Sequence, residues 1–260
     1  MLLKNKNAVV YGAGGGIGSA VSAAFAREGA RVFLVGRTRA RLEAVAKEIE
    51  AHGGRADVDV VDAFDAAAVD AHARDVVARG GSLDVSLNLV TRRDVQGIPL
   101  IDMDPEEYMR PLAEGVRSLF LTACAAGRHM AEQGSGVILA LDSGSAKASP
   151  GMGGTCPADA ASDTLIRQLA LELGPKGVRA LGIWAAGVPE TLTPEKLGAV
   201  DSRLRDAAAF QGVLDHLDSL RMLPASPPLE RIADLAAFLA SDRAGAVTGS
   251  FVNATAMFPS

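Results

Sequence analysis

The chain has 260 residues, of which 48% are hydrophobic and 22% charged, so it can bury one large core. Its formal net charge of −5 excludes a broad basic surface for nucleic acid or anionic membrane. Two cysteines and four scattered histidines form no disulfide framework and no metal-binding spacing, and we expect the histidines on helix surfaces. Without a bilayer-length apolar run or a signal-peptide core, the sequence predicts a cytoplasmic protein.

Short apolar strands alternate with amphipathic helices along the chain. The first helix is expected to follow a glycine-rich turn and to end at Gly29. We expect the strands at residues 8–11, 32–35, 58–61, 85–89, 137–141, 179–184 and 251–252, and further helices at 39–50, 66–78, 104–133, 157–173 and 229–239. Near-continuous apolar strands separated by helices predict one parallel sheet covered on both faces, a doubly wound Rossmann-type α/β fold forming a single domain over residues 1–260.

Two segments depart from this regular alternation. Pro111 lies inside the helical pattern at 104–133 and predicts a kink there. Residues 188–228 are punctuated by prolines, and we predict that they form a lid over a substrate site. Apolar residues in this segment, such as Leu197 and Phe210, indicate a small and fairly apolar substrate.

The turn between the first strand and the first helix is rich in glycine. Gly12 permits a tight turn, Gly16 allows the backbone to approach a pyrophosphate, and Gly18 lets the helix pack closely on the strand. Gly14 and Ile17 belong to the same turn, which would place phosphates at the positive end of the helix dipole. We therefore expect dinucleotide binding, while a turn that no longer binds a cofactor is the alternative.

The end of the second strand indicates which dinucleotide is bound. An acid there would hydrogen-bond the ribose hydroxyls of NAD, but this chain has Arg37, Thr38 and Arg39. Two arginines and a threonine favour a 2′-phosphate, so the sequence predicts NADP in preference to NAD.

The glycine spacing, within a chain of about this length, resembles the short-chain dehydrogenase/reductase family, and the resemblance extends over the whole chain. Residues 169–179 and 241–249 are similar to two further family segments. By this resemblance, further cofactor contacts are implied at Asp62, Ala63, Asn88, Gly187 and Thr191. The resemblance also implies a homodimer or homotetramer acting on a small-molecule substrate.

The chain departs from this family at the catalytic positions. The family uses a tyrosine and, four residues later, a lysine, but those positions hold Thr155 and Asp159 here. Neither Tyr11 nor Tyr108 is followed by a lysine at that spacing. The family's helical asparagine falls at about Gly115. Since an aliphatic hydroxyl is a far weaker acid than a phenol, the usual proton relay is lost.

The family's serine position falls at Asp142 or Ser143. Together with Thr155 and Asp159, these residues are the candidate catalytic groups. Three functions stay open at this point: an atypical oxidoreductase using NADP(H), a non-redox lyase or isomerase that uses Asp142 and Asp159, and a non-catalytic nucleotide-binding or scaffold protein.

Overall fold

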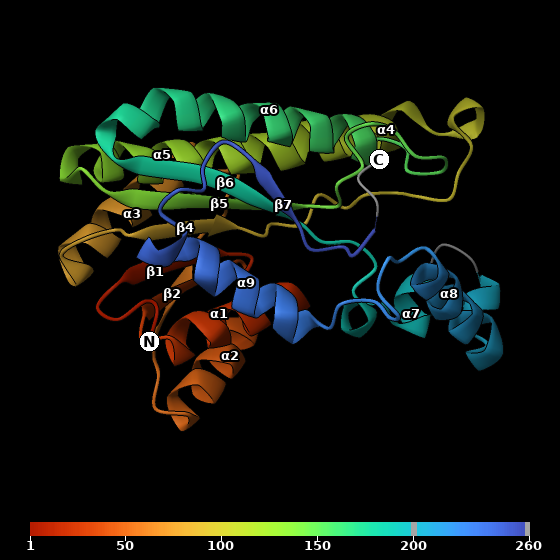
Figure 1. Ribbon diagram of the computed structural model, residues 1–260, viewed down its shortest axis with the longest axis horizontal. Coiled ribbons are helices and arrows are strands. Elements are labelled where there is room, and N and C mark those ends of the chain that lie inside the picture. Colours follow the sequence, from red (N-terminus) through yellow and green to blue (C-terminus); the bar gives the residue numbers. More distant parts are fainter. Residues whose placement is uncertain (199–201, 258–260) are drawn as a thin grey trace.

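The computed structural model describes residues 1–198 and 202–257. Within them, one seven-stranded sheet has the order β3-β2-β1-β4-β5-β6-β7, and its paired strands are parallel (Figure 1). The strands are β1 (Asn7–Tyr11), β2 (Arg31–Gly36), β3 (Arg55–Val60), β4 (Val85–Asn88), β5 (Gly136–Asp142), β6 (Val178–Trp184) and β7 (Phe251–Asn253). The predicted fold class is confirmed.

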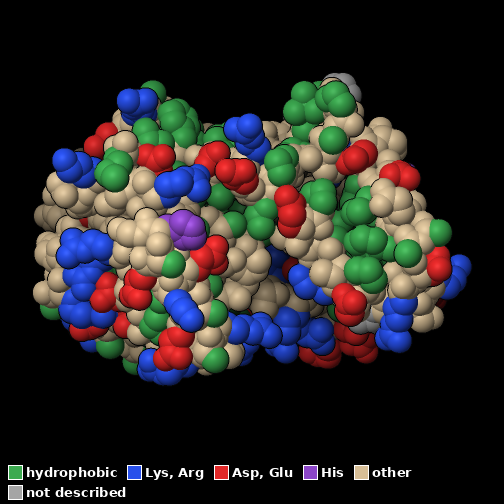
Figure 2. Space-filling model, turned by 90° about the horizontal axis from the view of Figure 1, so that it is seen from below, with side chains coloured by type: hydrophobic (Ala, Val, Ile, Leu, Met, Phe, Trp, Pro, Cys, Tyr) green, Lys and Arg blue, Asp and Glu red, His purple; other side chains and the backbone are tan. Residues whose placement is uncertain are grey.

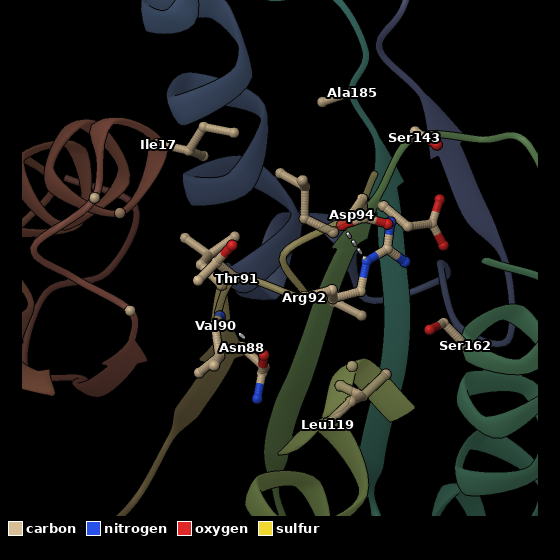
Figure 3. Close-up of a pocket in the computed structure, with 18 of the residues that line it drawn as sticks. Ile17, Asn88, Val90, Thr91, Arg92, Asp94, Leu119, Ser143, Ser162 and Ala185 are labelled. Carbon is tan, nitrogen blue, oxygen red and sulfur yellow. Dashed lines mark hydrogen bonds and ion pairs between the residues drawn. The ribbon is translucent and has the colours of Figure 1, made fainter. Parts of the chain in front are cut away.

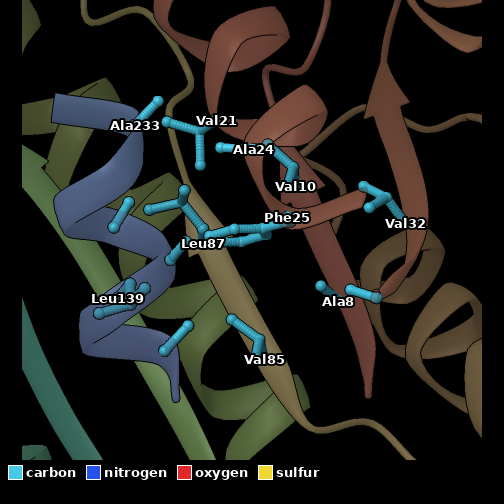
Figure 4. Packing of buried hydrophobic residues seen from close by; sticks show 14 of the residues in the cluster. Ala8, Val10, Val21, Ala24, Phe25, Val32, Val85, Leu87, Leu139 and Ala233 are labelled. Carbon is cyan, nitrogen blue, oxygen red and sulfur yellow. The ribbon is translucent and has the colours of Figure 1, made fainter. Parts of the chain in front are cut away.

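Helices cover both faces of the sheet (Figure 1). One face carries α1 (Gly16–Arg27), α2 (Arg39–Ala51) and α9 (Leu229–Ala240), and the other carries α3 (Ala66–Gly80), α5 (Arg117–Gln133) and α6 (Thr155–Leu173). Each face has its own apolar cluster. In the first cluster, Phe25 of α1 lies against the strands, between Leu87 of β4 and Val32 of β2 (Figure 4). Burial on both faces explains why the strand sequences are continuously apolar.

The helix predicted at residues 104–133 is divided, as Pro111 indicated. It consists of α4 (Pro105–Arg110), a π-helical segment (Pro111–Val116) and α5. Because proline supplies no backbone N–H, the regular hydrogen-bond ladder cannot continue through it. The helix predicted to begin at residue 157 begins earlier, at Thr155, and so takes Pro157 into its first turn.

One histidine was wrongly expected on a helix surface. His72 of α3 is buried because it occupies the helix face that also buries Val69, Ala73 and Val76. Its ring nitrogens are satisfied: Nδ1 lies 3.2 Å from the Tyr11 hydroxyl, and Nε2 lies 3.2 Å from Asp59 Oδ2. Such pairing makes a buried histidine tolerable.

The segment between β6 and α9 projects from the body of the molecule (Figure 1). Its helices are α7 (Pro194–Leu197) and α8 (Ala207–Ser219), and no residue of α8 is fully buried. Figure 2 shows hydrophobic side chains gathered over this part of the surface, with a hollow between it and the rest of the molecule. Residues 199–201 of the predicted lid lie outside the described residues. Among the described residues, no helix combines the length and apolar character that crossing a membrane requires.

The strand order places a crevice beside β1. From β1 the chain adds β2 and then β3 on one side, and it then crosses to the other side of β1 to add β4 to β7. The direction in which strands are added therefore reverses between β1 and β4. Tyr11 at the end of β1 is in register with Asn88 at the end of β4. Ligands of open α/β sheets bind outside the carboxyl ends of the strands at such a reversal.

Candidate cofactor site and active site

The glycine-rich turn has the backbone geometry that its sequence predicted. Gly12 has φ +84°, and a Cβ on it would lie 2.4 Å from the Leu89 carbonyl oxygen. A Cβ on Gly18 would lie 2.2 Å from the Gly12 carbonyl oxygen, so only glycine allows α1 to approach the strand end this closely. The first turn of α1 has neither a capping side chain nor an acid, which leaves its N–H groups open to an anion.

Two cavities meet at this turn. The outer cavity, of about 200 Å³, lies over the ends of β2 and β3, and the inner cavity, of about 360 Å³, lies over the ends of β4 and β5. They share Gly12, Gly15 and residues 89–91. A Cβ on Gly16 would meet only Thr191 Cγ2, at 3.8 Å, so its α-carbon faces open space. This open backbone at a helix start fits a pyrophosphate lying between the two cavities.

The residues expected to bind the cofactor all line cavities at this edge of the sheet. The outer cavity is lined by Gly12, Gly14, Arg37, Thr38, Asp62 and Ala63. The inner cavity is lined by Gly12, Gly16, Ile17, Gly18, Asn88 and Thr191. Gly187 lines instead a third, largely apolar cavity of about 530 Å³, which shares Ser143 and Ala185 with the inner cavity. We call it the apolar cavity.

Asp159 is the centre of a buried polar network. Its side chain is completely buried, and its Oδ1 lies 2.7 Å from Nη1 of Arg92. Its Oδ2 accepts hydrogen bonds from the Ser143 hydroxyl (2.5 Å) and the Ser145 backbone N–H (2.9 Å). Arg92 also lies 3.2 Å from Asp94 through Nη2. Arg92, Ser143 and the Ser145 N–H each donate to Asp159, so these hydrogen bonds hold the carboxylate in place. Asp159 lines neither the inner nor the apolar cavity.

Asp142, the last residue of β5, has a different environment. It is 3% exposed and lines the inner cavity. Its Oδ1 accepts the Gly144 backbone N–H at 2.9 Å, while Oδ2 is buried and has no hydrogen-bond partner that meets ordinary geometry among the described residues. The carboxyl group of Asp163 lies close enough to interact with that of Asp142. Burial, followed by the charge of Asp159, raises the pKa of Asp142 to about 8, despite the opposing Gly144 N–H and Arg92. Burial also raises the pKa of the neighbouring Asp163. Asp142 is therefore largely protonated at neutral pH.

Comparison with known proteins identifies the family. A family profile described as enoyl-(acyl carrier protein) reductase matches residues 12–254. The L-rhamnose 1-dehydrogenase (NAD(P)(+)) of Azotobacter vinelandii is 32% identical over 262 residues, which cover 96% of this chain and 95% of the relative. This chain belongs to the short-chain dehydrogenase/reductase family. It is an oxidoreductase by that membership, and family members use a nicotinamide dinucleotide.

Other short-chain dehydrogenase/reductases are similar over the whole chain. The short-chain reductase protein NovJ of Streptomyces niveus is 32% identical over 251 residues, covering 95% of this chain and 91% of the relative. The structure of a short-chain dehydrogenase/reductase from Serratia marcescens superposes with a TM-score of 0.83 and 28% identity, with full coverage of both chains. These likenesses extend through the region that carries the altered catalytic positions.

The structure places the four candidate catalytic residues in two groups. Asp142 and Ser143 line the inner cavity, whereas Thr155 and Asp159 line neither the inner nor the apolar cavity. Thr155 is 1% exposed and donates its hydroxyl to Asp94 Oδ1 at 2.9 Å. The residue at the family's tyrosine position is thus part of the buried network and has no access to the cavities that a substrate could occupy.

Several residues of the site were missed by the sequence analysis. Arg92 and Asp94 line the inner cavity, and Arg41 lines the outer one. The available signal was the run after Asn88, where Leu89-Val90-Thr91 departs from the residues typical of the family at that point. Arg92 contacts Asp159 across 67 positions, so its place in the site became apparent only in the folded chain.

Proposed function

We propose that this chain is an NADP(H)-dependent oxidoreductase that interconverts a small, largely apolar carbonyl compound and its alcohol without a tyrosine and lysine relay. The observation that carries this proposal is that Asp142, a buried carboxyl group, lines the same cavity as the glycine-rich turn; its raised pKa favours the protonated form. The cofactor, when bound, supplies hydride to a carbonyl carbon or accepts it from an alcohol. A protein group must then exchange one proton with the substrate oxygen.

Asp142 is the group that we assign to this proton exchange. In reduction, the carbonyl carbon gains hydride, the C=O π bond breaks, and the O–H proton of Asp142 passes to the substrate oxygen, which leaves Asp142 as a carboxylate. In oxidation, the carboxylate accepts the alcohol proton. A pKa of about 8 suits both directions near neutral pH. Asp159 is less suited because its oxygens are already occupied by Arg92, Ser143 and Ser145.

The outer cavity supports NADP as the preferred cofactor. Arg37, Thr38 and Arg41 line it, and no acid lies at residues 36–38 to hydrogen-bond a 2′-hydroxyl. Guanidinium groups bind phosphate through charge-assisted hydrogen bonds, whereas the unphosphorylated ribose of NAD offers them no anion.

Replacing Arg37 tests this cofactor assignment. We expect Arg37→Ala to weaken NADPH binding about 10- to 100-fold, because one charge-assisted phosphate contact is lost, and to change NADH binding by less than about threefold. Arg39 also counted in the sequence toward a 2′-phosphate, but it pairs with Glu43 at 3.7 Å and does not line the outer cavity, so Arg39→Ala is the matched control. Isothermal titration calorimetry measures the affinities of the wild type and of both variants for NADPH and for NADH. Equal losses for NADPH and NADH would contradict the assignment.

The apolar cavity supports a small, largely apolar substrate. Among the residues that line it are Trp184, Leu197, Val213 and Leu217. Val213 and Leu217 belong to α8, which supports the assignment of residues 188–228 as a substrate-site lid. Ser143 and Ala185 line both this cavity and the inner one, so a substrate held here lies next to the cavity that Asp142 lines.

The reaction class is tested by following absorbance near 340 nm with purified protein, NADPH and a panel of small apolar ketones and aldehydes. We expect loss of absorbance that depends on the added carbonyl compound. Conversion of a compound without any change at 340 nm would instead favour the lyase or isomerase function. Binding of NADPH without conversion of any compound would favour a non-catalytic protein.

Two exposed apolar side chains support a homodimer or homotetramer. Phe120 of α5 is 50% exposed and Leu171 of α6 is 79% exposed, so both neighbouring helices present apolar surface to solvent. Light scattering coupled to gel filtration determines the assembly, and a monomer would contradict this part of the proposal.

A further inference from the structure

Arg92 lies at the centre of the inner cavity although nothing in the sequence motifs singled it out. It follows β4, and its guanidinium lies beside Asp94 with Ser143 and Ser162 beyond it (Figure 3). Nη1 lies 2.7 Å from Asp159 Oδ1, and Nε lies 3.3 Å from Asp94 Oδ2. Burial opposes the charge of Arg92, but Asp94 and then Asp159 outweigh it and raise the pKa of the guanidinium above its ordinary value. Arg92 is therefore a fixed, permanently charged group.

Gly115 provides the space that Arg92 occupies. A Cβ on Gly115 would lie 2.4 Å from Cδ and 2.7 Å from Cγ of Arg92. The position therefore accepts no side chain while Arg92 adopts this conformation. Two residues therefore determine the position of Arg92. Gly115 leaves room for its side chain, and Asp159 holds its guanidinium.

The guanidinium retains hydrogen-bonding capacity. It has five N–H groups, and its contacts with Asp94 and Asp159 use one on Nε, one on Nη1 and one on Nη2. One N–H on each terminal nitrogen has no acceptor among the described residues. Of the side chains lining the inner cavity in residues 1–198 and 202–257, only Arg92 carries a positive charge.

We propose that Arg92 is a cofactor-binding residue that holds the nicotinamide half of the dinucleotide. This inference rests on the proposed function. A dinucleotide with its adenosine in the outer cavity and its pyrophosphate at the glycine-rich turn has its other half in the inner cavity, where the two remaining N–H groups of Arg92 meet hydroxyl or amide oxygens. Asp159 and Asp94 act as positioning residues, because they fix the guanidinium and do not themselves donate.

The test compares the whole cofactor with a fragment that lacks the nicotinamide half. Calorimetry measures the binding of NADPH and of adenosine 2′,5′-bisphosphate to the wild type and to Arg92→Met. A double variant, Arg92→Met/Asp159→Asn, avoids leaving a buried carboxylate without its cation. Gly115→Ala displaces the guanidinium without removing it. Arg93→Met is the matched control, because Arg93 is exposed and pairs with Glu114 away from the cavity.

We expect the three variants at Arg92 and Gly115 to bind NADPH at least about tenfold more weakly than the wild type. Binding of the bisphosphate should change by less than about twofold, which also shows that each variant is folded. Unchanged NADPH affinity in the double variant and in Gly115→Ala would overturn the role of Arg92 while leaving the proposed function intact. If the bisphosphate fails to bind the wild type, the cofactor assignment falls, and this inference falls with it.

Discussion

Asp142→Asn should lower the rate of carbonyl reduction about 10²- to 10⁴-fold, the range expected for loss of a general acid. The asparagine has nearly the same shape and can still accept the Gly144 N–H, but it cannot release a proton. The rate of the wild type should fall as the pH rises through about 8, and the rate of alcohol oxidation should rise over the same interval. Asp70→Asn, a surface aspartate paired with Arg128, is the control and should leave both rates unchanged.

The same variant has a stability signature that needs no substrate. The pKa of Asp142 is about 8 in the folded chain and about 4 when unfolded, so the folded state binds the extra proton. This contribution to stability is fully present below about pH 4 and is lost as the pH rises through about 8. Between pH 5 and pH 9, the free energy of unfolding of the wild type should therefore fall by several kcal/mol relative to that of Asp142→Asn. Urea unfolding at each pH measures both values. A difference that does not vary with pH would contradict a protonated Asp142.

Asp159→Lys, which restores the residue typical of the family, should destabilise this chain by about 3–5 kcal/mol. The lysine removes the acceptor of Arg92, Ser143 and Ser145, and it places a second cation against the guanidinium. For a domain of this size the melting temperature should fall by about 10 °C. The double variant Thr155→Tyr/Asp159→Lys should consequently fail to recover the family's catalysis.

A double-mutant cycle separates charge repulsion from general damage to the fold. Adding Arg92→Met to Asp159→Lys should recover part of the lost stability, because the repulsion between the two cations disappears. Glu114→Gln is the control, since it breaks the exposed pair with Arg93 and should cost less than about 1 kcal/mol. If Asp159→Lys were as stable as the wild type, Asp159 would not be the buried partner of Arg92.

The fold and the cofactor half of the site follow from local patterns. The tight turn at Gly12 and the close packing at Gly18 involve neighbours in sequence, so the glycine spacing was sufficient to predict them. The alternation of buried strands with amphipathic helices likewise predicted the parallel sheet. His72 shows the limit of this reasoning, because its burial depends on Tyr11 and Asp59, which reach it from two separate strands.

The candidate catalytic residues could be predicted only as positions where this chain differs from the family pattern. Thr155 and Asp159 were identified as replacements, but their partners lie far away: Asp94 and Arg92 are 61 and 67 positions distant in the chain. Position 115 was identified only as the place of the family's asparagine, and the reason for a glycine there appeared when the Arg92 side chain was found against it. The sequence left open whether Asp142 or Ser143 takes the family's serine position, and in the structure both residues line the inner cavity.

Carboxyl ¹³C NMR of the protein labelled at its aspartates, recorded from pH 4 to pH 10 and repeated on Asp142→Asn, tests directly whether a protonated carboxylic acid lines this cavity. The account predicts one aspartate resonance that titrates near pH 8 in the wild type and is missing from the variant. Titration of the Asp142 carboxyl at about pH 4, the ordinary value for an aspartate, would contradict the account.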